Sequence, residues 1–308
     1  MSSPPRIVTL TLNPAVDVSS EAEEVRHTDK TRTRGDQFEA GGGGINVARV
    51  LIRLGADVSA IFLAGGATGR LLDELLGGVC LDRTVIRIAG DTRMSLTVFE
   101  TSSGNEFRFV PEGPEISGEE WGRALDEAAA AECDYLIASG SLPRGVPDDF
   151  YALLAERIAG RGTRLVLDTS GEALRAALNF GGLFLVKPSR AELEELAGRE
   201  LPEPGDVIVE AQRVVAAGKA QNVAVSLGRD GAIFVGSEQA QVLPAIDVQA
   251  CSAVGAGDSF LAATTYGFAT GLDAGDSFRL GMAGGAAAVL SCGSELAKAE
   301  DIWKLYRQ

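Results

Sequence analysis

Two glycine runs, each followed directly by an apolar helical stretch, constrain the fold and function of this chain more than any other feature. They lie at Gly41–Gly44 and Gly255–Gly257. Glycines in front of a helix let successive backbone N–H groups point into one small volume, where the positive end of the helix dipole also attracts an anion. Glycine supplies 38 of the 308 residues, about 12% against a usual ~7%. The pattern predicts two helix starts that approach anionic or polar ligands.

The first run is poorly explained by a turn alone. Four consecutive glycines are costly, because glycine loses more conformational freedom on folding than any other residue. Close approach of a ligand to the backbone of Gly41–Gly44 is the better explanation. Asn46 follows in the first turn of the helix, and its amide offers both donors and acceptors to sugar hydroxyls.

The second run is followed by Asp258 in the first turn of an apolar helix. A carboxylate at this position can serve as a helix cap or as a general base. Taken alone, so short a pattern is more often a tight turn with an aspartate cap. Neither glycine run matches the phosphate loop G-x-x-x-x-G-K-[ST] or the dinucleotide motif that follows a first strand. The second run therefore indicates an anion site without fixing its use.

Short apolar strands alternate with amphipathic helices over most of the chain. The expected strands cover 6–12, 58–63, 135–138, 164–168, 183–186 and 222–226, and the expected helices cover 44–54, 68–76, 117–131, 148–160, 172–178, 190–197 and 206–217. A hairpin at 231–243 and helices near 258–270, 274–291 and 298–306 complete the chain. This alternation predicts an α/β fold with a mostly parallel sheet covered by helices on both faces.

A few short strands do not fit this alternation. Ser95–Glu100 and Glu106–Val110 flank the turn-forming residues 101–105, and Thr31–Phe38 is also strand-like. We expect these segments to form a small separate sheet. The predicted organisation is one α/β domain over 1–308 with a small β lid built from about 16–40 and 92–110.

Composition excludes several function classes. Lys and Arg number 28 against 43 Asp and Glu, a net charge of −15, which argues against nucleic-acid or membrane-surface binding. His27 is the only histidine, so a multi-histidine metal site is excluded. The four cysteines form no C-x-x-C pair, which argues against a zinc knuckle. With no signal-peptide core and no apolar stretch of ~18 residues, we expect a cytoplasmic protein.

The motifs that carry chemistry occur in a characteristic order. They are T-L-N-P-A-V-D at 11–17, G-G-G-G-I-N-V-A-R at 41–49, S-G-S-L-P at 139–143, K-P-x-x-x-E at 187–192, S-L-G at 226–228 and G-A-G-D at 255–258. In this order, over essentially the whole chain, they resemble the ribokinase-like (PfkB) carbohydrate kinases. The 6-phosphofructokinase branch is the most similar, because its sister enzymes usually carry lysine at the position of Gly43.

The resemblance implies a reaction in which ATP phosphorylates the 1-hydroxyl of fructose 6-phosphate to fructose 1,6-bisphosphate, a glycolytic step. Asp258 would be the general base that accepts the hydroxyl proton as the γ-phosphoryl group transfers. The backbone N–H groups of Gly255, Ala256 and Gly257 would stabilise the charge on the transferring group.

The same resemblance implies a sugar-phosphate site. Its sugar-binding residues would be Asp17, Gly42, Gly43, Gly44, Asn46 and Ser139. Arg93 matches the family's phosphate-binding arginine, and Lys30 and Arg32 on the lid are further candidates. Arginine suits this role because its guanidinium binds phosphate through two parallel hydrogen bonds. The alternative for all three cations is a solvated charge on an exposed strand edge.

The nucleotide side is implied by a second group of matching residues. They are Lys187, Ser189, Glu192, Ser226 and Gly228, together with Gly255 and Gly257. The family uses an Asn-x-x-Glu motif here to organise Mg²⁺ and phosphates through water, and Ser189 replaces the asparagine in this chain. The resemblance still implies that Glu192 organises Mg²⁺ through water. The alternative is that Glu192 belongs to an exposed acidic face of its helix.

Two further properties follow from the resemblance. Backbone carbonyls near the anion hole bind an activating K⁺ in many family members, and the matching residues are Ser252, Val254, Ala288, Ser291 and Gly293. The lid is expected to form a homodimer, because a small isolated sheet has exposed edges and too small a core to be stable alone.

Three other functions remain as alternatives. The first is a sister kinase, a 1-phosphofructokinase or a tagatose-6-phosphate kinase. The second is a nucleotide-binding oxidoreductase, which would need a dinucleotide glycine motif after the first strand. The third is an inactive sugar-binding regulator, which would be expected to lack Asp258 or the glycines before it, and both are present.

Overall fold

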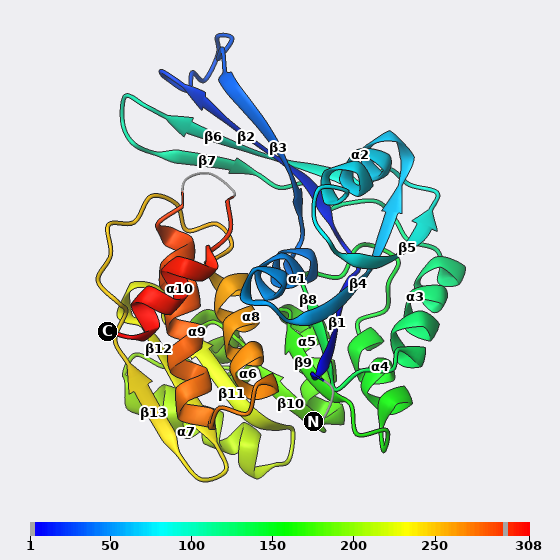
Figure 1. Ribbon diagram of the computed structural model, residues 1–308, viewed down its shortest axis with the longest axis vertical. Coiled ribbons are helices and arrows are strands. Elements are labelled where there is room, and N and C mark those ends of the chain that lie inside the picture. The colour runs from blue at the N-terminus through cyan, green and yellow to red at the C-terminus, as the bar shows by residue number, and fades with distance from the viewer. Residues whose placement is uncertain (1–3, 292–294) are drawn as a thin grey trace.

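A computed structural model describes residues 4–291 and 295–308, and its largest element is a nine-stranded sheet (Figure 1). The strand order is β13-β12-β11-β10-β9-β8-β1-β4-β5. In chain order the strands are β1 (Arg6–Thr11), β4 (Asp57–Gly65), β5 (Asp82–Ile88), β8 (Tyr135–Ser139), β9 (Arg164–Asp168), β10 (Leu183–Val186), β11 (Ala220–Ser226), β12 (Ala232–Gly236) and β13 (Ala240–Leu243).

The sheet is mostly parallel, and its strand order reverses beside β1. Every pair from β11 to β5 is parallel, and only β12 pairs antiparallel with both of its neighbours. The chain passes from β1 to β4 and β5, and then returns to β8 on the other side of β1. In open α/β sheets, ligands bind outside the carboxyl ends of the strands at such a reversal. The topology therefore places the expected site beyond the ends of β1 and β8.

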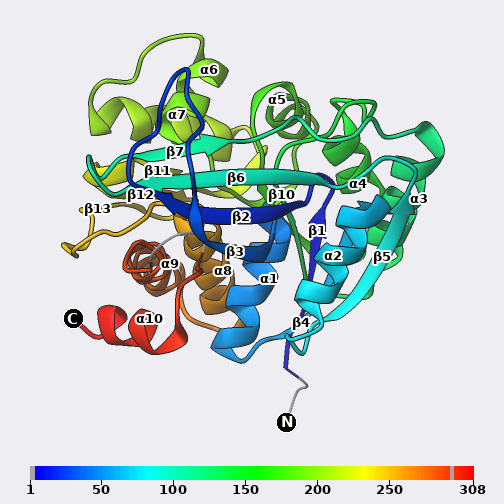
Figure 2. The same ribbon diagram turned by 90° about the horizontal axis from the view of Figure 1, so that it is seen from above.

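Helices cover both faces of this sheet (Figure 2). One face carries α1 (Gly43–Leu54), α2 (Gly66–Leu76), α8 (Ala256–Ala269), α9 (Ala274–Val289) and α10 (Ala299–Tyr306). The other carries α3 (Gly118–Ala130), α4 (Phe150–Ile158), α5 (Gly171–Phe180), α6 (Arg190–Ala197) and α7 (Pro204–Ala216). In β1, Ile7 packs toward the first group and Val8 toward the second, because alternate side chains of a strand point to opposite faces. The expected α/β class is confirmed.

A separate four-stranded sheet rises from the carboxyl edge of the main sheet (Figure 1). It has the order β3-β2-β6-β7 and is called the lid below. Its strands are β2 (Ala15–Ala22), β3 (Arg34–Gly41), β6 (Arg93–Glu100) and β7 (Glu106–Phe109). β6 and β7 pair antiparallel, as the hairpin pattern predicts. The lid leaves the body where β1 ends, because β2 begins only four residues after Thr11.

Two strands differ from the expectation from sequence. β5 continues the alternation after α2, although no strand was expected between the helix at 68–76 and the strand at 95–100. β5 is an edge strand, and Arg83 and Arg87 interrupt its apolar pattern and pair with Asp73. β2 was not expected either, because Asp17, Ser19 and Glu21 give it a polar character.

Within the described ranges, every helix is too short or too polar to cross a bilayer.

Candidate active site

The two glycine-led helix starts meet beyond the carboxyl edge of the sheet. α1 begins at Gly43 and α8 at Ala256. In their first turns, the Asn46 Nδ2 donates a hydrogen bond to the Asp258 Oδ2 at 2.9 Å. An amide suited to sugar hydroxyls and a carboxylate suited to proton transfer are therefore joined directly, although 212 positions separate them in the chain.

The glycines before α1 are required by the chain's own packing. A Cβ atom at position 43 would lie 2.9 Å from the Ser139 carbonyl carbon and closer still to its Oγ. At position 44 it would lie 2.6 Å from the Leu10 carbonyl oxygen, and at position 41 it would overlap the Asp17 carboxylate. The explanation by ligand approach alone is therefore incomplete, because α1 already starts in contact with the ends of β1 and β8.

The start of α8 has the geometry of an anion site. Gly255 is the N-cap, with φ of +72°, and supplies no side chain to bond the first-turn N–H groups. The Lys187 Nζ lies 3.5 Å from where a Cβ atom on Gly257 would be. The uncapped N-terminus of α8 therefore lies next to the Lys187 ammonium group. Both stabilise negative charge.

Lys187 is held by a carboxylate that was not expected from the sequence. Its Nζ lies 3.0 Å from the Asp168 Oδ1, and its side chain is 9% exposed. Burial alone would lower the pKa of Lys187, but the carboxylates of Asp168, Asp258 and Glu192 raise it. Lys187 is therefore a permanent cation beside the start of α8. Asp168 is the last residue of β9, and its place at the carboxyl end of an apolar strand is the signal that could have identified it.

Ser139, the last residue of β8, lies inside the same group of side chains. It is 1% exposed, and its Oγ donates to the Asp168 Oδ2 at 3.4 Å. Ser139 therefore lies between the start of α1 and the Lys187–Asp168 pair.

The pKa of Asp258 is raised to about 6. Burial is the main cause, and the negative charge of Asp168 adds to it. The hydrogen bond from Asn46 and the charge of Lys187 act in the opposite direction. A carboxylate with this pKa is ionised at neutral pH, yet binds a proton more strongly than an ordinary aspartate, which suits a general base.

Asp17 faces the site from the lid. It pairs in register with Ser95 of β6. Burial raises the pKa of Asp17, and the positive charges of Arg108 and Arg93 lower it. Arg108 of β7 was not selected from the sequence. The alternation of β7 could have placed it, because Arg108 and Glu106 share one face of that strand.

Arg93 holds the base of the lid together. Its Nη1 donates to the Pro111 carbonyl at 2.9 Å and its Nη2 to the Asn13 carbonyl at 2.8 Å. Its Nε is buried without a hydrogen-bond partner in the described part of the chain. The other two expected phosphate ligands, Lys30 and Arg32, are exposed on the connection between β2 and β3. The structure brings Arg93 close to Asp17 but does not bring Lys30 or Arg32 with it.

The expected nucleotide-binding residues lie together at the ends of β10 and β11. Ser189 is the N-cap of α6, and its Oγ accepts from the Glu192 N–H while the Glu192 carboxylate accepts from the Ser189 N–H. Serine and asparagine are about equally good N-caps, so the cap tolerates serine in place of the family's asparagine. Ser189 also forms a bridge with Ser226, and Gly228 follows with φ of +62°.

The segments expected to bind K⁺ lie beside each other. The Cys251 N–H donates to the Val289 carbonyl at 2.7 Å, so the segment with Ser252 and Val254 runs past the C-terminal end of α9. Carbonyls at a helix C-terminus carry partial negative charge and favour a cation. Ala288 and Ser291 lie at this end. Gly293, the fifth expected ligand, lies outside the described residues.

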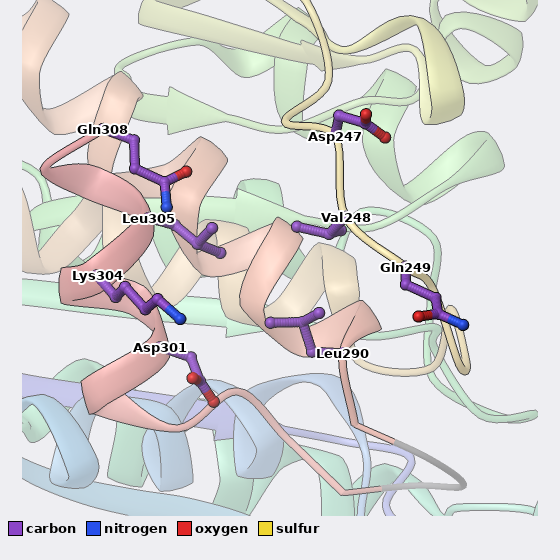
Figure 3. A pocket seen from close by; sticks show the side chains of 8 residues that line it. All are labelled: Asp247, Val248, Gln249, Leu290, Asp301, Lys304, Leu305 and Gln308. Atoms are coloured by element: carbon purple, nitrogen blue, oxygen red, sulfur yellow. The ribbon is translucent and has the colours of Figure 1, made fainter.

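A pocket of about 250 Å³ lies on the outer side of the same segment (Figure 3). Val248, Leu290 and Leu305 form its apolar wall, and Asp301 and Lys304 of α10 line its rim. None of the expected site residues lines it. In residues 4–291 and 295–308, no three His, Cys, Asp or Glu side chains gather into a metal site.

Comparison with known proteins gives one consistent family. The pfkB family of carbohydrate kinases matches residues 10–300. The chain is 41% identical over 304 residues to "ATP-dependent 6-phosphofructokinase isozyme 2" of Mycobacterium tuberculosis, covering 98% of this chain and 89% of that protein. It is 41% identical over 303 residues to the Escherichia coli protein of the same name, covering 98% of each. It is 33% identical to "1-phosphofructokinase" of Borreliella burgdorferi, covering 98% of this chain and 97% of that one.

Solved structures agree. The Escherichia coli phosphofructokinase-2 in complex with potassium superimposes with a TM-score of 0.95 at 39% identity, covering 98% of each chain. The same enzyme in complex with fructose 6-phosphate gives a TM-score of 0.93 at 39% identity and the same coverage.

Proposed function

Because this chain belongs to the pfkB family of carbohydrate kinases, we propose that it transfers the γ-phosphoryl group of ATP to the 1-hydroxyl of fructose 6-phosphate. The product is fructose 1,6-bisphosphate. The observation that carries the proposal is the hydrogen bond between Asn46 and Asp258. This bond brings the Asn46 amide, which can bind sugar hydroxyls, next to the Asp258 carboxylate, which can act as the base at the start of α8.

In this proposal, Asp258 takes the proton of the 1-hydroxyl as the hydroxyl oxygen attacks the γ-phosphorus atom. Its pKa of about 6 keeps it ionised at neutral pH, and Asn46 holds one of its oxygens in place. Negative charge on the transferring phosphoryl group is stabilised by the first-turn N–H groups of α8 and by Lys187. The transition state is loose and needs proton removal only late, so positioning and charge supply most of the rate enhancement.

Mg²⁺ bound with ATP would neutralise charge on the phosphates. The described part of the chain has no cluster of carboxylates that could hold this ion alone. The residues present therefore fit an ion that takes most of its ligands from phosphate oxygens and water. Glu192 would hold a metal-bound water. Its negative charge acts on Lys187, and the cap bond from Ser189 orients its carboxylate.

The sugar would lie between α1 and the lid, with hydroxyls on Asp17 and Asn46 and with the Gly42–Gly44 backbone and Ser139 beneath it. Arg93 would bind the phosphate already present on the sugar. Arg108 supports this arrangement, because it is close enough to lower the pKa of Asp17 and so adds a second guanidinium at this end of the site.

The alternative substrate is fructose 1-phosphate or tagatose 6-phosphate. The relatives named 1-phosphofructokinase share 32% to 33% identity with this chain, against 41% for those named 6-phosphofructokinase. Gly43 also favours the first proposal. Its close contact with the Ser139 backbone leaves no space for the lysine that is usual in the sister enzymes.

An activating K⁺ is proposed beside the anion hole, held by carbonyl groups of the segments with Ser252, Val254, Ala288, Ser291 and Gly293. The approach of Cys251 to the end of α9 supports this, as does the potassium complex of the Escherichia coli enzyme. Turnover measured in potassium and in a bulky organic cation tests the site, and equal rates would reject it.

A homodimer through the lid is also proposed. Phe38, Leu96 and Phe109 are 46%, 39% and 56% exposed. Their strand positions place them on one face of the lid, opposite to Asp17. Leu96→Glu is expected to give a monomer in sedimentation. Val242→Glu, at an exposed apolar position on β13, should leave the assembly unchanged.

The function is tested by measuring ADP release with ATP and each of fructose 6-phosphate, fructose 1-phosphate, tagatose 6-phosphate and fructose. We expect kcat/KM to be highest for fructose 6-phosphate. A preference for either of the other two phosphorylated sugars would establish a sister kinase. No sugar-dependent release from the folded protein would reject the proposed activity.

A further inference from the structure

Glu106 links the lid to the segment in front of the anion hole. The Ser252 Oγ donates a hydrogen bond to the Glu106 Oε2 at 3.1 Å, across 146 positions of the chain. Ser252 is 6% exposed, and Glu106 is half-buried. This hydroxyl–carboxylate pair is therefore largely protected from water, where a hydrogen bond to a charged group is stronger than on an open surface.

Glu106 lies on the face of the lid that points to the site. Asp17 pairs with Ser95, and Arg108 pairs with Thr97 two residues further along β6. Glu106 pairs with Phe99, again two residues further. Because alternate residues of a strand share a face, Glu106 belongs to the row that contains Asp17 and Arg108.

Two arginines hold the lid at its base. Arg49 of α1 donates to the Ala40 carbonyl at 2.6 Å and pairs with Glu39 at 3.1 Å. Arg93 donates to the carbonyls of Asn13 and Pro111. Glu106 lies at the opposite end of the β6–β7 hairpin, next to the turn (Figure 1). Because this contact is farther from the base, it restrains pivoting of the lid more effectively than the contacts at the base do.

Ser252 transmits this contact to the anion hole. Its Oγ also accepts a hydrogen bond from the Val254 N–H at 3.3 Å. The same oxygen therefore binds the lid on one side and shapes the backbone on the other. Val254 directly precedes Gly255, the N-cap of α8. The conformation of the anion hole and the position of the lid are thus connected through one hydroxyl group.

We propose that Glu106 is a positioning residue for phosphoryl transfer, which fastens the lid to the anion-hole segment through Ser252. The inference rests on the proposed kinase function. Without this bond, the lid opens more often and water reaches the γ-phosphorus atom. Water then forms the new P–O bond in place of the sugar hydroxyl, the bond to the β-phosphate oxygen breaks, and the products are ADP, inorganic phosphate and a proton. Closing the site excludes this side reaction.

The test compares Glu106→Ala with Glu106→Gln, whose amide oxygen still accepts from Ser252. Inorganic phosphate and sugar bisphosphate are measured in the same reaction at saturating ATP and sugar phosphate. Glu106→Ala is expected to raise the ratio of phosphate to bisphosphate about three- to tenfold, and to raise the KM of the sugar phosphate more than that of ATP. Glu106→Gln is expected to stay within about twofold of wild type.

Glu21→Ala is the matched control, because Glu21 is an exposed lid glutamate whose ion pair with Arg34 spans 3.6 Å. It should behave as wild type. A wild-type product ratio for Glu106→Ala would overturn the proposal. Equal damage in Glu106→Gln would also overturn it, because charge rather than the hydrogen bond would then be responsible.

A second measurement does not depend on the kinase function. Hydrogen–deuterium exchange of the ligand-free protein should be at least about threefold faster at the Val254 amide in Glu106→Ala than in wild type. Unchanged exchange there would overturn the proposed link even in an active kinase. Faster exchange in a protein without kinase activity would support the link and reject only the proposed reaction.

Discussion

Asn46 of α1 and Asp258 of α8 share a hydrogen bond of 2.9 Å, so the first turns of two helices far apart in the chain form one site. The bond is directional. The Asn46 amide donates to the carboxylate, which leaves the other Asp258 oxygen for a proton and the Asn46 carbonyl for a sugar hydroxyl. A base that must accept one particular proton benefits from being held in this way.

Replacing Asp258 by Asn should remove the base while keeping the shape of the site. We expect kcat to fall by about 10²- to 10⁴-fold, with KM values for both substrates changing by less than about threefold. Steady-state kinetics of the purified variant, with circular dichroism to verify folding, measures this. Turnover close to that of wild type would exclude Asp258 as the base.

The raised pKa of Asp258 also predicts a pH-dependent stability. Its pKa is about 6 in the folded protein against an ordinary value of 3.8, so the folded state binds more protons between these values. Stability from this group is therefore present at low pH and is lost as pH rises through about 6. Asp258→Asn does not titrate, and should be more stable than wild type by about 1–3 kcal/mol at pH 8 but not at pH 4.

Thermal unfolding of both proteins from pH 4 to pH 8 measures this difference. Asp36→Asn, at an exposed position on the lid, is the control for an aspartate-to-asparagine change away from the site. A difference between Asp258→Asn and wild type that does not change with pH would contradict the raised pKa of Asp258.

Structural features that depend on local sequence could be predicted. Gly255 precedes α8 and Asp258 lies in its first turn, as expected from the glycine run. The S-x-x-E spacing of Ser117 and Glu120 is typical of a capping box, and the structure has one there. The fold class was predictable for the same reason, because strand and helix periodicities are local properties.

Contacts that depend on strand order could not be predicted. Asp168 and Lys187 pair because β9 and β10 are neighbours in the sheet, which the sequence does not state. Arg93 donates to two backbone carbonyls from distant segments, and backbone carbonyls have no sequence signature. β5 could not be recognised because it is an edge strand, and edge strands often carry charged residues. Its sequence therefore lacks the continuous apolar run that marks the central strands.

Breaking the Lys187–Asp168 pair should destabilise the protein strongly. Asp168→Ala leaves the buried Lys187 ammonium without its nearest partner at 3.0 Å, and an uncompensated buried charge costs about 3–5 kcal/mol. The affinity for ATP should fall as well, because Lys187 is no longer held beside the start of α8. Urea unfolding and nucleotide titration measure the two effects.

The control for this prediction is an exposed ion pair. Glu172→Ala removes a partner of Arg175 on the surface of α5, and such pairs contribute about 0–1 kcal/mol. If Asp168→Ala and Glu172→Ala had equal effects on unfolding, the buried pair would not have the structural role assigned to it.

Gly43 should tolerate no side chain. In Gly43→Ala, the new methyl group would lie 2.9 Å from the Ser139 carbonyl carbon and 3.0 Å from the Gly140 nitrogen. Both are backbone atoms, so α1 must move away from β8, at a cost of about 1–3 kcal/mol. Because Asn46 is in the first turn of α1, the same movement should lengthen its bond to Asp258 and lower kcat. Gly78→Ala, where nothing lies within 4 Å, is the matched control. Unfolding and turnover of both variants decide the matter, and a Gly43→Ala protein as stable and active as Gly78→Ala would show that the close contact at the end of β8 does not position the site.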